Sequence, residues 1–283
     1  MALTGYHRPA TVDEAVALLA ADADAKPIAG GATLVAMLNA RVIEPPALVS
    51  LDGIAELQGL SAAAGGGVRI GAFTRHRDTA ASPLLVGTLA VVRDAAGQIA
   101  NATVRNMGTI GGSIAFADPG LDYPPALVAA AAEIEIAGPD GRRRVPAAEF
   151  FIDWYSTALQ PGEIVIAVHL PPADALGTGL YVKHARVAGD YATASVAICR
   201  RADGAVSVAV GGCGPAPLAS AEVNALLSAG TDDAALGRAG ALLQALADPL
   251  DDVRGSADYR RALIPRLLQR ALRQAEAAPE GRA

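Results

Sequence analysis

The sequence predicts an α+β protein, with two α/β lobes followed by a C-terminal domain that combines a small antiparallel sheet with helices. Short apolar runs of strand character alternate with helix-period segments as far as Pro171-Pro172. A stretch typical of a linker follows at 174–178. The rest of the chain has strand-like runs first and helical segments afterwards. We therefore expect lobes at about 1–57 and 58–177, and a C-terminal domain at 178–283.

The first lobe is expected to begin with a capped helix. Thr11 and Glu14 have the spacing of a capping box. A glycine pair, Gly30-Gly31, separates the following strand from a second helix. That helix would start at the glycine pair, so that its dipole favours an anion there. The expected elements are a helix at 12–21, a strand at 27–29, a helix at 33–39 and a strand at 47–51.

The second lobe is expected to be a half-buried sheet with helices. Gly65-Gly66-Gly67 predicts a hairpin tip, and Pro139-Asp140-Gly141 is a strong turn signal. The stretch at 104–119 between the helices is expected to be a glycine-rich loop. The expected elements are strands at 68–72, 133–137, 142–146 and 163–170, and helices from about 77, over most of 84–99 and at 126–132.

The C-terminal domain is expected to be an antiparallel meander covered by helices. Ala202-Asp203-Gly204 predicts the turn that joins the last two strands. The tail after Pro279 is expected to be disordered. The expected elements are strands at 179–186, 192–200 and 205–211, and helices at 220–229, 232–246 and 256–277.

Composition excludes several classes of function. The formal net charge of −6 argues against a nucleic-acid-binding role. The most apolar run, at 126–136, contains Glu133 and Glu135, so no membrane span is expected. The N-terminus has no basic region followed by an apolar core, which favours a cytoplasmic location. Cys199 and Cys213 are expected to be buried free thiols.

Two glycine segments are candidates for binding phosphate. In the stretch 104–119, Gly108, Gly111 and Gly112 leave the backbone free to adopt positive φ, with hydroxyls at Thr109 and Ser113. The earlier pair at 30–31 is likewise followed by a hydroxyl. Neither segment fits G-x-G-x-x-G or G-x-x-x-x-G-K-[ST]. The two segments could hold the two ends of a diphosphate, and the alternative for each is a tight structural turn.

The order of these segments resembles the FAD-binding medium subunit of the molybdenum-containing hydroxylases, a family that includes carbon monoxide dehydrogenase and xanthine dehydrogenase. The resemblance is carried by Ala29-Gly30-Gly31-Ala32-Thr33-Leu34, by Arg105-Asn106-Met107-Gly108-Thr109-Ile110-Gly111-Gly112-Ser113, by Ala117-Asp118-Pro119 with Asp122, and by the segment 181–192. It implies a PCMH-type FAD-binding fold, with non-covalent FAD between the two lobes and the C-terminal domain and its pyrophosphate at the glycine segments.

The resemblance also implies roles for individual side chains. Asp122 would accept hydrogen bonds from ribose or ribityl hydroxyls, Lys183 would place a cation near the flavin, and Tyr191 would lie near the flavin face. Asp118 would either contact the cofactor or cap the helix after Pro119. The alternative for Tyr191 is a structural role in the hydrophobic core. The expected cofactor-binding residues are Pro27, Ile28, Ala29, Gly30, Gly31, Ala32, Thr33, Leu34, Ile99, Ala100, Thr109, Ile110, Gly111, Gly112, Ser113, Ala115, Asp118, Asp122, Val165, Lys183 and Tyr191.

No catalytic side chains are expected, because no Ser-His-Asp, Cys-His or carboxylate pair stands out. His76 has no identifiable partner, and a surface or capping role is expected for it. By resemblance, the chain would collect electrons from two [2Fe–2S] clusters of a small subunit, beside a large molybdopterin-binding subunit, in a dimer of heterotrimers. The alternatives are a scaffold subunit that has lost its flavin and a stand-alone flavin oxidoreductase.

Overall fold

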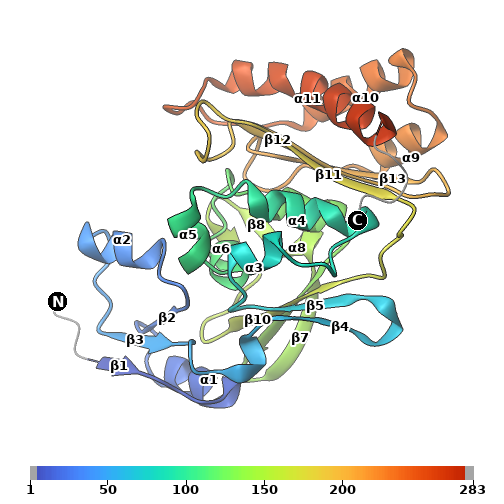
Figure 1. The fold of residues 1–283 in the computed structure, drawn as a ribbon. Coiled ribbons are helices and arrows are strands. Elements are labelled where there is room, and N and C mark those ends of the chain that lie inside the picture. Colours follow the sequence, from blue (N-terminus) through green and yellow to red (C-terminus); the bar gives the residue numbers. More distant parts are fainter. Residues whose placement is uncertain (1–4, 278–283) are drawn as a thin grey trace.

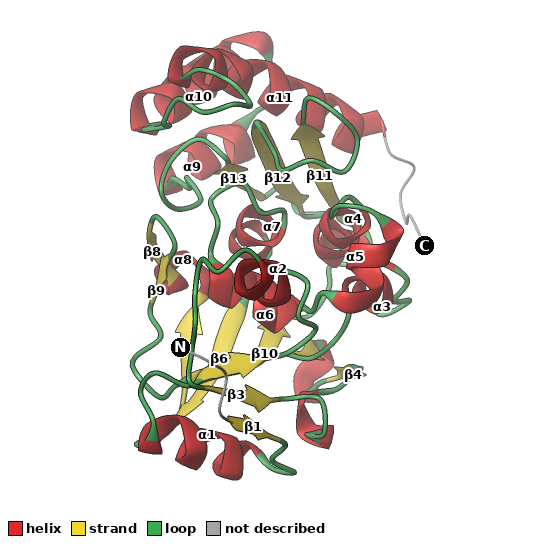
Figure 2. Cartoon of the chain, turned by 90° about the vertical axis from the view of Figure 1, so that its left-hand side faces the viewer, coloured by secondary structure: helices red, strands yellow, loops and turns green. Residues whose placement is uncertain are grey.

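The computed structural model describes residues 5–277, and the predicted disorder after Pro279 lies outside them. Figure 1 shows the layers from the N-terminal lobe, through the second lobe, to the C-terminal domain, whose helices form the outer layer. Figure 2, turned by 90°, shows the same stacking of layers. The mixed α and β fold is that expected from the sequence. No helix in the described range has the length and apolar character needed to cross a membrane.

The N-terminal lobe is built on a parallel three-stranded sheet in the order β1-β3-β2. The Thr11 hydroxyl accepts a hydrogen bond from the Glu14 N–H (3.2 Å), and Glu14 accepts one from the Ala10 N–H (2.8 Å). The predicted helix cap is therefore confirmed. Helix α2 has no buried residue although its sequence is almost entirely apolar. The elements are β1 (Gly5–His7), α1 (Val12–Ala21), β2 (Lys26–Ile28), α2 (Leu34–Asn39) and β3 (Ala47–Ser50).

The second lobe contains an antiparallel five-stranded sheet in the order β4-β5-β10-β6-β7. Helices α4 and α7 lie between this sheet and the C-terminal domain (Figure 2). The elements are β4 (Leu60–Ala62), β5 (Val68–Gly71), α3 (His76–Ala80), α4 (Ala90–Gly97), α5 (Ala102–Met107), α6 (Ile110–Phe116), α7 (Tyr123–Ala129), β6 (Glu133–Gly138), β7 (Gly141–Pro146), α8 (Ala147–Phe150), β8 (Phe151–Asp153), β9 (Ser156–Thr157) and β10 (Ile164–Leu170).

The stretch at 104–119, predicted to be a loop, is largely helical. Asn101 caps α5 by accepting from the Val104 N–H (3.1 Å), and Thr109 caps α6. The glycines of this stretch do not adopt positive φ. Gly111 instead permits a close approach, because a Cβ there would lie 2.8 Å from the Ala72 carbonyl oxygen. Gly111 therefore serves packing within a helix, whereas the sequence predicts a loop here.

The helix predicted over most of 84–99 is also shorter than expected. A 3₁₀ turn covers Gly87–Leu89, and regular helix begins only at Ala90. Gly87 has a φ of +55°, and a Cβ there would collide with the Asp174 carbonyl oxygen. The segment that leads to the C-terminal domain therefore occupies the space that an earlier helical turn would need.

The C-terminal domain is the antiparallel meander predicted, in the order β11-β12-β13. Its sheet and helices enclose a second cluster of buried apolar residues. The other face of the sheet adds Tyr181, Ala197, Cys199 and Ala209 to the cluster of the two lobes. Cys199 and Cys213 are free and buried, as predicted. The elements are β11 (Thr178–His184), β12 (Ala194–Arg200), β13 (Val206–Gly211), α9 (Ala221–Ala229), α10 (Asp233–Leu246) and α11 (Ala257–Ala277).

Candidate cofactor site

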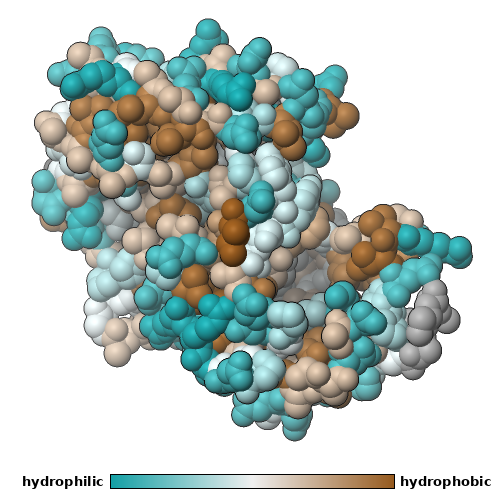
Figure 3. Space-filling model, turned by 180° about the vertical axis from the view of Figure 1, so that it is seen from behind, coloured by the Kyte–Doolittle hydropathy of each residue, from teal (hydrophilic) through white to brown (hydrophobic). Residues whose placement is uncertain are grey.

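A cavity of about 610 Å³ lies where the two lobes meet the C-terminal domain. Its size is within the range of ligand-binding pockets. Figure 3 shows a hollow beside the apolar residues of the projecting N-terminal lobe. Most of the expected residues line the cavity: Pro27, Ala29, Gly30, Gly31, Ala32, Thr33, Leu34, Ile99, Ala100, Thr109, Gly111, Gly112, Ser113, Ala115, Asp122, Val165 and Tyr191.

The two glycine segments lie side by side, as the diphosphate hypothesis requires. A Cβ on Gly30 would collide with the Met107 carbonyl oxygen and lie 3.2 Å from Gly108 Cα. A Cβ on Gly112 would lie 3.9 Å from the Ala29 side chain. The first segment therefore packs backbone to backbone against the end of α5 and the start of α6.

The two segments offer different hydrogen-bond donors. Gly31 has a φ of +74°, and the N–H groups of Gly31, Ala32 and Thr33 have no acceptor within the described part of the chain. In the second segment, by contrast, the Ile110 N–H donates to the Thr74 carbonyl (3.0 Å). The N–H groups of 111–113 also have acceptors within the chain. Open main-chain donors thus come from the first segment.

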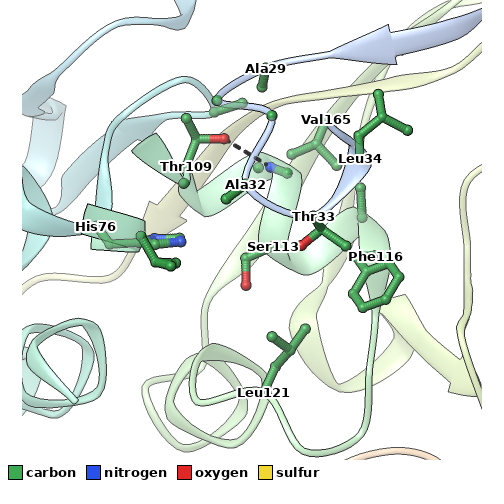
Figure 4. A pocket seen from close by; sticks show the side chains of 18 of the residues that line it. Ala29, Ala32, Thr33, Leu34, His76, Thr109, Ser113, Phe116, Leu121 and Val165 are labelled. Carbon is green, nitrogen blue, oxygen red and sulfur yellow. Dashed lines mark hydrogen bonds between the residues drawn. The ribbon is translucent and has the colours of Figure 1, made fainter. Parts of the chain in front are cut away.

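Hydroxyls supply further donors. Thr109 Oγ1 accepts from the Gly112 N–H (3.2 Å; dashed line in Figure 4), which leaves its own hydrogen available. Ser113 and Thr33 also line the cavity (Figure 4). The combination of open amides and hydroxyls suits an anion such as a pyrophosphate.

Asp122 is a buried carboxylate in the cavity wall, only 4% exposed. Its Oδ1 lies 3.0 Å from Lys183 Nζ and accepts from the Tyr181 hydroxyl (2.7 Å). Burial raises the pKa of Asp122, and the opposing effects of Lys183 and Tyr181 are smaller. Lys183 also donates to the Gln98 carbonyl (3.2 Å). Lys183 is not a wall residue, so it affects the cavity through Asp122.

Three further expected residues do not line the cavity. Asp118 accepts from the Tyr155 hydroxyl (3.0 Å) and from the Gly120 N–H (2.8 Å), and it does not cap α7, which begins after Asp122. Ile110 is completely buried in the core. Ile28 lies beneath the first glycine segment, near Gly31.

His76 is a cavity residue that the sequence interpretation missed. It is only 5% exposed, and its Nδ1 lies 3.2 Å from the buried Tyr123 hydroxyl. Burial lowers the pKa of His76 to about 4, so the ring is neutral near pH 7. Its partner follows 47 residues later, and no local pattern indicates that pairing. Phe116, Leu121 and Asp190 also line the cavity (Figure 4 shows the first two).

Two lobes and a C-terminal domain that enclose a largely apolar cavity with a main-chain cradle define a cofactor-binding protein whose cavity suits a ligand that carries phosphate. Residues 2–173 match the family described as FAD binding domain in molybdopterin dehydrogenase. Residues 180–275 match the CO dehydrogenase flavoprotein C-terminal domain. The chain belongs to the FAD-binding family of the molybdopterin dehydrogenases.

Individual relatives match almost the whole chain. The carbon monoxide dehydrogenase medium chain of Hydrogenophaga pseudoflava is 39% identical over 278 residues, which cover 95% of this chain and 96% of the relative. The glyceraldehyde dehydrogenase medium chain of Sulfolobus acidocaldarius is 32% identical over 274 residues, which cover 95% of this chain and 97% of the relative.

The structure also has a solved counterpart. A chain of carbon monoxide dehydrogenase from Hydrogenophaga pseudoflava matches with a TM-score of 0.92 and 37% identity, covering 96% of this chain and 97% of its own. The resemblance inferred from the motifs is therefore confirmed. The chain is an oxidoreductase subunit of the FAD-binding medium-chain type.

Proposed function

We propose that this chain holds FAD non-covalently in the cavity and serves as the electron-transfer subunit of a three-subunit molybdenum hydroxylase. It would accept electrons from the [2Fe–2S] clusters of a small subunit and pass them to an external acceptor. The observation that carries the proposal is the contact between the two glycine segments at Gly30 and Met107, which puts open amides and hydroxyls at one place in the cavity.

The first segment and the facing hydroxyls would hold the pyrophosphate. The N–H groups of Gly31, Ala32 and Thr33 are open, and Thr33 and Ser113 add hydroxyl donors. Each hydrogen bond to a charged group contributes about 1.5–3 kcal/mol. Since the amides of 110–113 already donate within the chain, the second segment would contribute mainly through Thr109 and Ser113.

Asp122 would accept hydrogen bonds from cofactor hydroxyls, held in orientation by Lys183 and Tyr181. Buried apolar residues would exclude water from the flavin, among them Ile99 and Val165. When bound, FAD supplies the capacity to take up electrons singly or in pairs. The chain itself would bind the cofactor, orient it and exclude water.

The molybdenum cofactor would belong to a large subunit, and the assembly would be a cytoplasmic dimer of heterotrimers. Similar medium chains belong to a carbon monoxide dehydrogenase and to a glyceraldehyde dehydrogenase, two enzymes named for different substrates. The similarity of those chains to this one supports the idea that substrate choice resides in the large subunit.

Purification of the full chain tests the proposal. Yellow protein that releases FAD on denaturation, and that copurifies with molybdenum- and iron–sulfur-containing polypeptides when co-expressed with them, is the expected result. Colourless protein that takes up no FAD would instead identify a scaffold subunit. Flavin-containing protein that turns over without partner polypeptides would identify a stand-alone oxidoreductase.

Variants locate the pyrophosphate site. Thr33→Ala and Ser113→Ala should each weaken FAD binding about ten- to a hundredfold, because each removes a hydrogen bond to a charged group. Ser61→Ala is the matched control, since Ser61 is an exposed hydroxyl on β4 outside this cavity. Unchanged FAD affinity in both cavity variants would argue against the assignment of these hydroxyls.

A further inference from the structure

Part of the cavity wall comes from the loop between β11 and β12. Gly189, Asp190 and Tyr191 line the cavity, and we call these three residues the lip. A Cβ on Gly189 would lie 2.8 Å from the Ala100 carbonyl oxygen, so the lip packs closely against the second lobe. The C-terminal domain therefore closes one side of a cavity that is otherwise formed by the two lobes.

Arg254 holds this lip from outside the cavity. Its Cζ lies 5.0 Å from the centroid of the Tyr191 ring, within the range of a cation–π interaction. Its Nε lies 3.1 Å from Asp190 Oδ1, which also accepts from the Tyr191 N–H (2.7 Å). Arg254 is not a cavity residue. It therefore contacts both the ring and the carboxylate that orients the Tyr191 backbone.

The segment that carries Arg254 is itself fixed. Asp252 Oδ1 accepts from the Arg254 N–H (2.8 Å) and from Arg260 Nη2 (2.6 Å). Arg260, on α11, is 5% exposed and donates to the Thr193 carbonyl (2.6 Å). The loop that carries the lip, through Thr193, and the Arg254 segment are thus attached to the same buried guanidinium. This arrangement gives the guanidinium of Arg254 a defined position.

We propose that Arg254 is a positioning residue for Tyr191, which keeps the lip closed against the cavity and so controls the retention of the cofactor. The proposal rests on the proposed function, since it assumes that the cavity holds FAD. The positioning of the lip itself can be measured without cofactor.

Hydrogen exchange on the full chain tests the positioning. Several amides of the loop are hydrogen-bonded, among them Ala192 to the Gly120 carbonyl (3.1 Å) and Thr193 to the His184 carbonyl (2.8 Å), so loosening of the lip will raise their exchange. Arg254→Met should raise exchange over residues 185–193 about two- to fivefold, the factor expected for loss of one partly exposed cation–π contact. Arg254→Lys keeps the charge but loses the planar group that reaches both partners, so its exchange should lie between those of the wild type and Arg254→Met.

Asp190→Asn provides a second variant that weakens the same link without removing packing atoms. It should raise exchange over the same peptide. Arg201→Met is the control for loss of an arginine, since Arg201 forms a longer and more exposed pair with Asp203 (3.7 Å) beyond β12, at the end of that strand remote from Thr193. Exchange of the lip should be unaffected by this change.

The rate of FAD release links the lip to the cofactor. FAD release should be faster in Arg254→Met by a factor similar to the change in exchange. Tyr191→Ala removes the ring itself and should show the largest increase in the rate of FAD release. Wild-type exchange over 185–193 in both Arg254→Met and Asp190→Asn would overturn the proposal. A wild-type chain that binds no FAD would overturn the proposed function, and the exchange comparison would then decide the positioning of the lip alone.

Discussion

Replacing Lys183 by methionine should destabilise the chain by about 3 kcal/mol at pH 7. Lys183 Nζ lies 3.0 Å from Asp122 Oδ1, and both side chains are 6% exposed. Removing one partner of a buried pair costs about 3–5 kcal/mol, because the other charge is left uncompensated. We expect the lower end of this range, since Tyr181 continues to donate to the carboxylate (2.7 Å).

The assay is urea unfolding at pH 7 of the wild type, K183M, D122N and the double variant. Because the double variant leaves no charge buried, it should be more stable than the sum of the single effects predicts. The coupling free energy should exceed about 1.5 kcal/mol. Additive effects, within about 0.5 kcal/mol, would refute the interpretation of the pair as an interacting unit.

The loss of stability in K183M should depend on pH. Burial already raises the pKa of Asp122, and Lys183 opposes that shift. In K183M the pKa of Asp122 should rise further. A carboxyl whose folded pKa is raised binds its proton more readily in the folded state, so its stabilising contribution is lost as the pH rises through that pKa. The free energy of unfolding of K183M should therefore lie closer to that of the wild type at pH 5 than at pH 7.

Four further predictions concern other parts of the site and the core. Because the folded pKa of His76 is lowered from 6.5 to about 4, stability should fall by up to about 3 kcal/mol as the pH drops through that interval, and urea unfolding of His76→Asn should show a flatter pH dependence. Gly111→Ala should lower the melting temperature by several degrees, since its Cβ would lie 2.6 Å from that of Ala72. Gly112→Val, at an exposed position, should leave the melting temperature closer to that of the wild type while weakening FAD binding, as titration with FAD would show. Burial raises the pKa of both Cys199 and Cys213 to about 12, so a thiol reagent should modify them only after unfolding.

Local patterns in the sequence were sufficient for much of the fold. The capping box at Thr11 and Glu14 marks the start of α1, and the Pro139-Asp140-Gly141 turn marks the hairpin of β6 and β7. Both depend on residues within a few positions of one another, so tertiary contacts have little room to override them. The domain boundary placed at 174–178 stays a prediction.

The failures have non-local causes. The stretch 104–119 contains glycines that look like loop residues, yet Gly111 is needed because the backbone of Ala72 packs against it. His76 acquires its cavity position from a pairing with Tyr123. Lys183 is expected near the flavin by resemblance, which stays a prediction, and its ion pair with Asp122 cannot be read from the spacing of the two residues. Each outcome is set by a partner that is distant in sequence.

The exposure of helix α2 bears on when the N-terminal lobe becomes fully packed. None of its residues is buried, and Leu34 and Met37 line the cavity. A filled cavity would give these side chains the apolar neighbours that the polypeptide alone does not supply. The cofactor then acts as a late component of the interior of the N-terminal lobe, and a protease should cut the apoprotein between residues 30 and 43 more readily than the loaded chain.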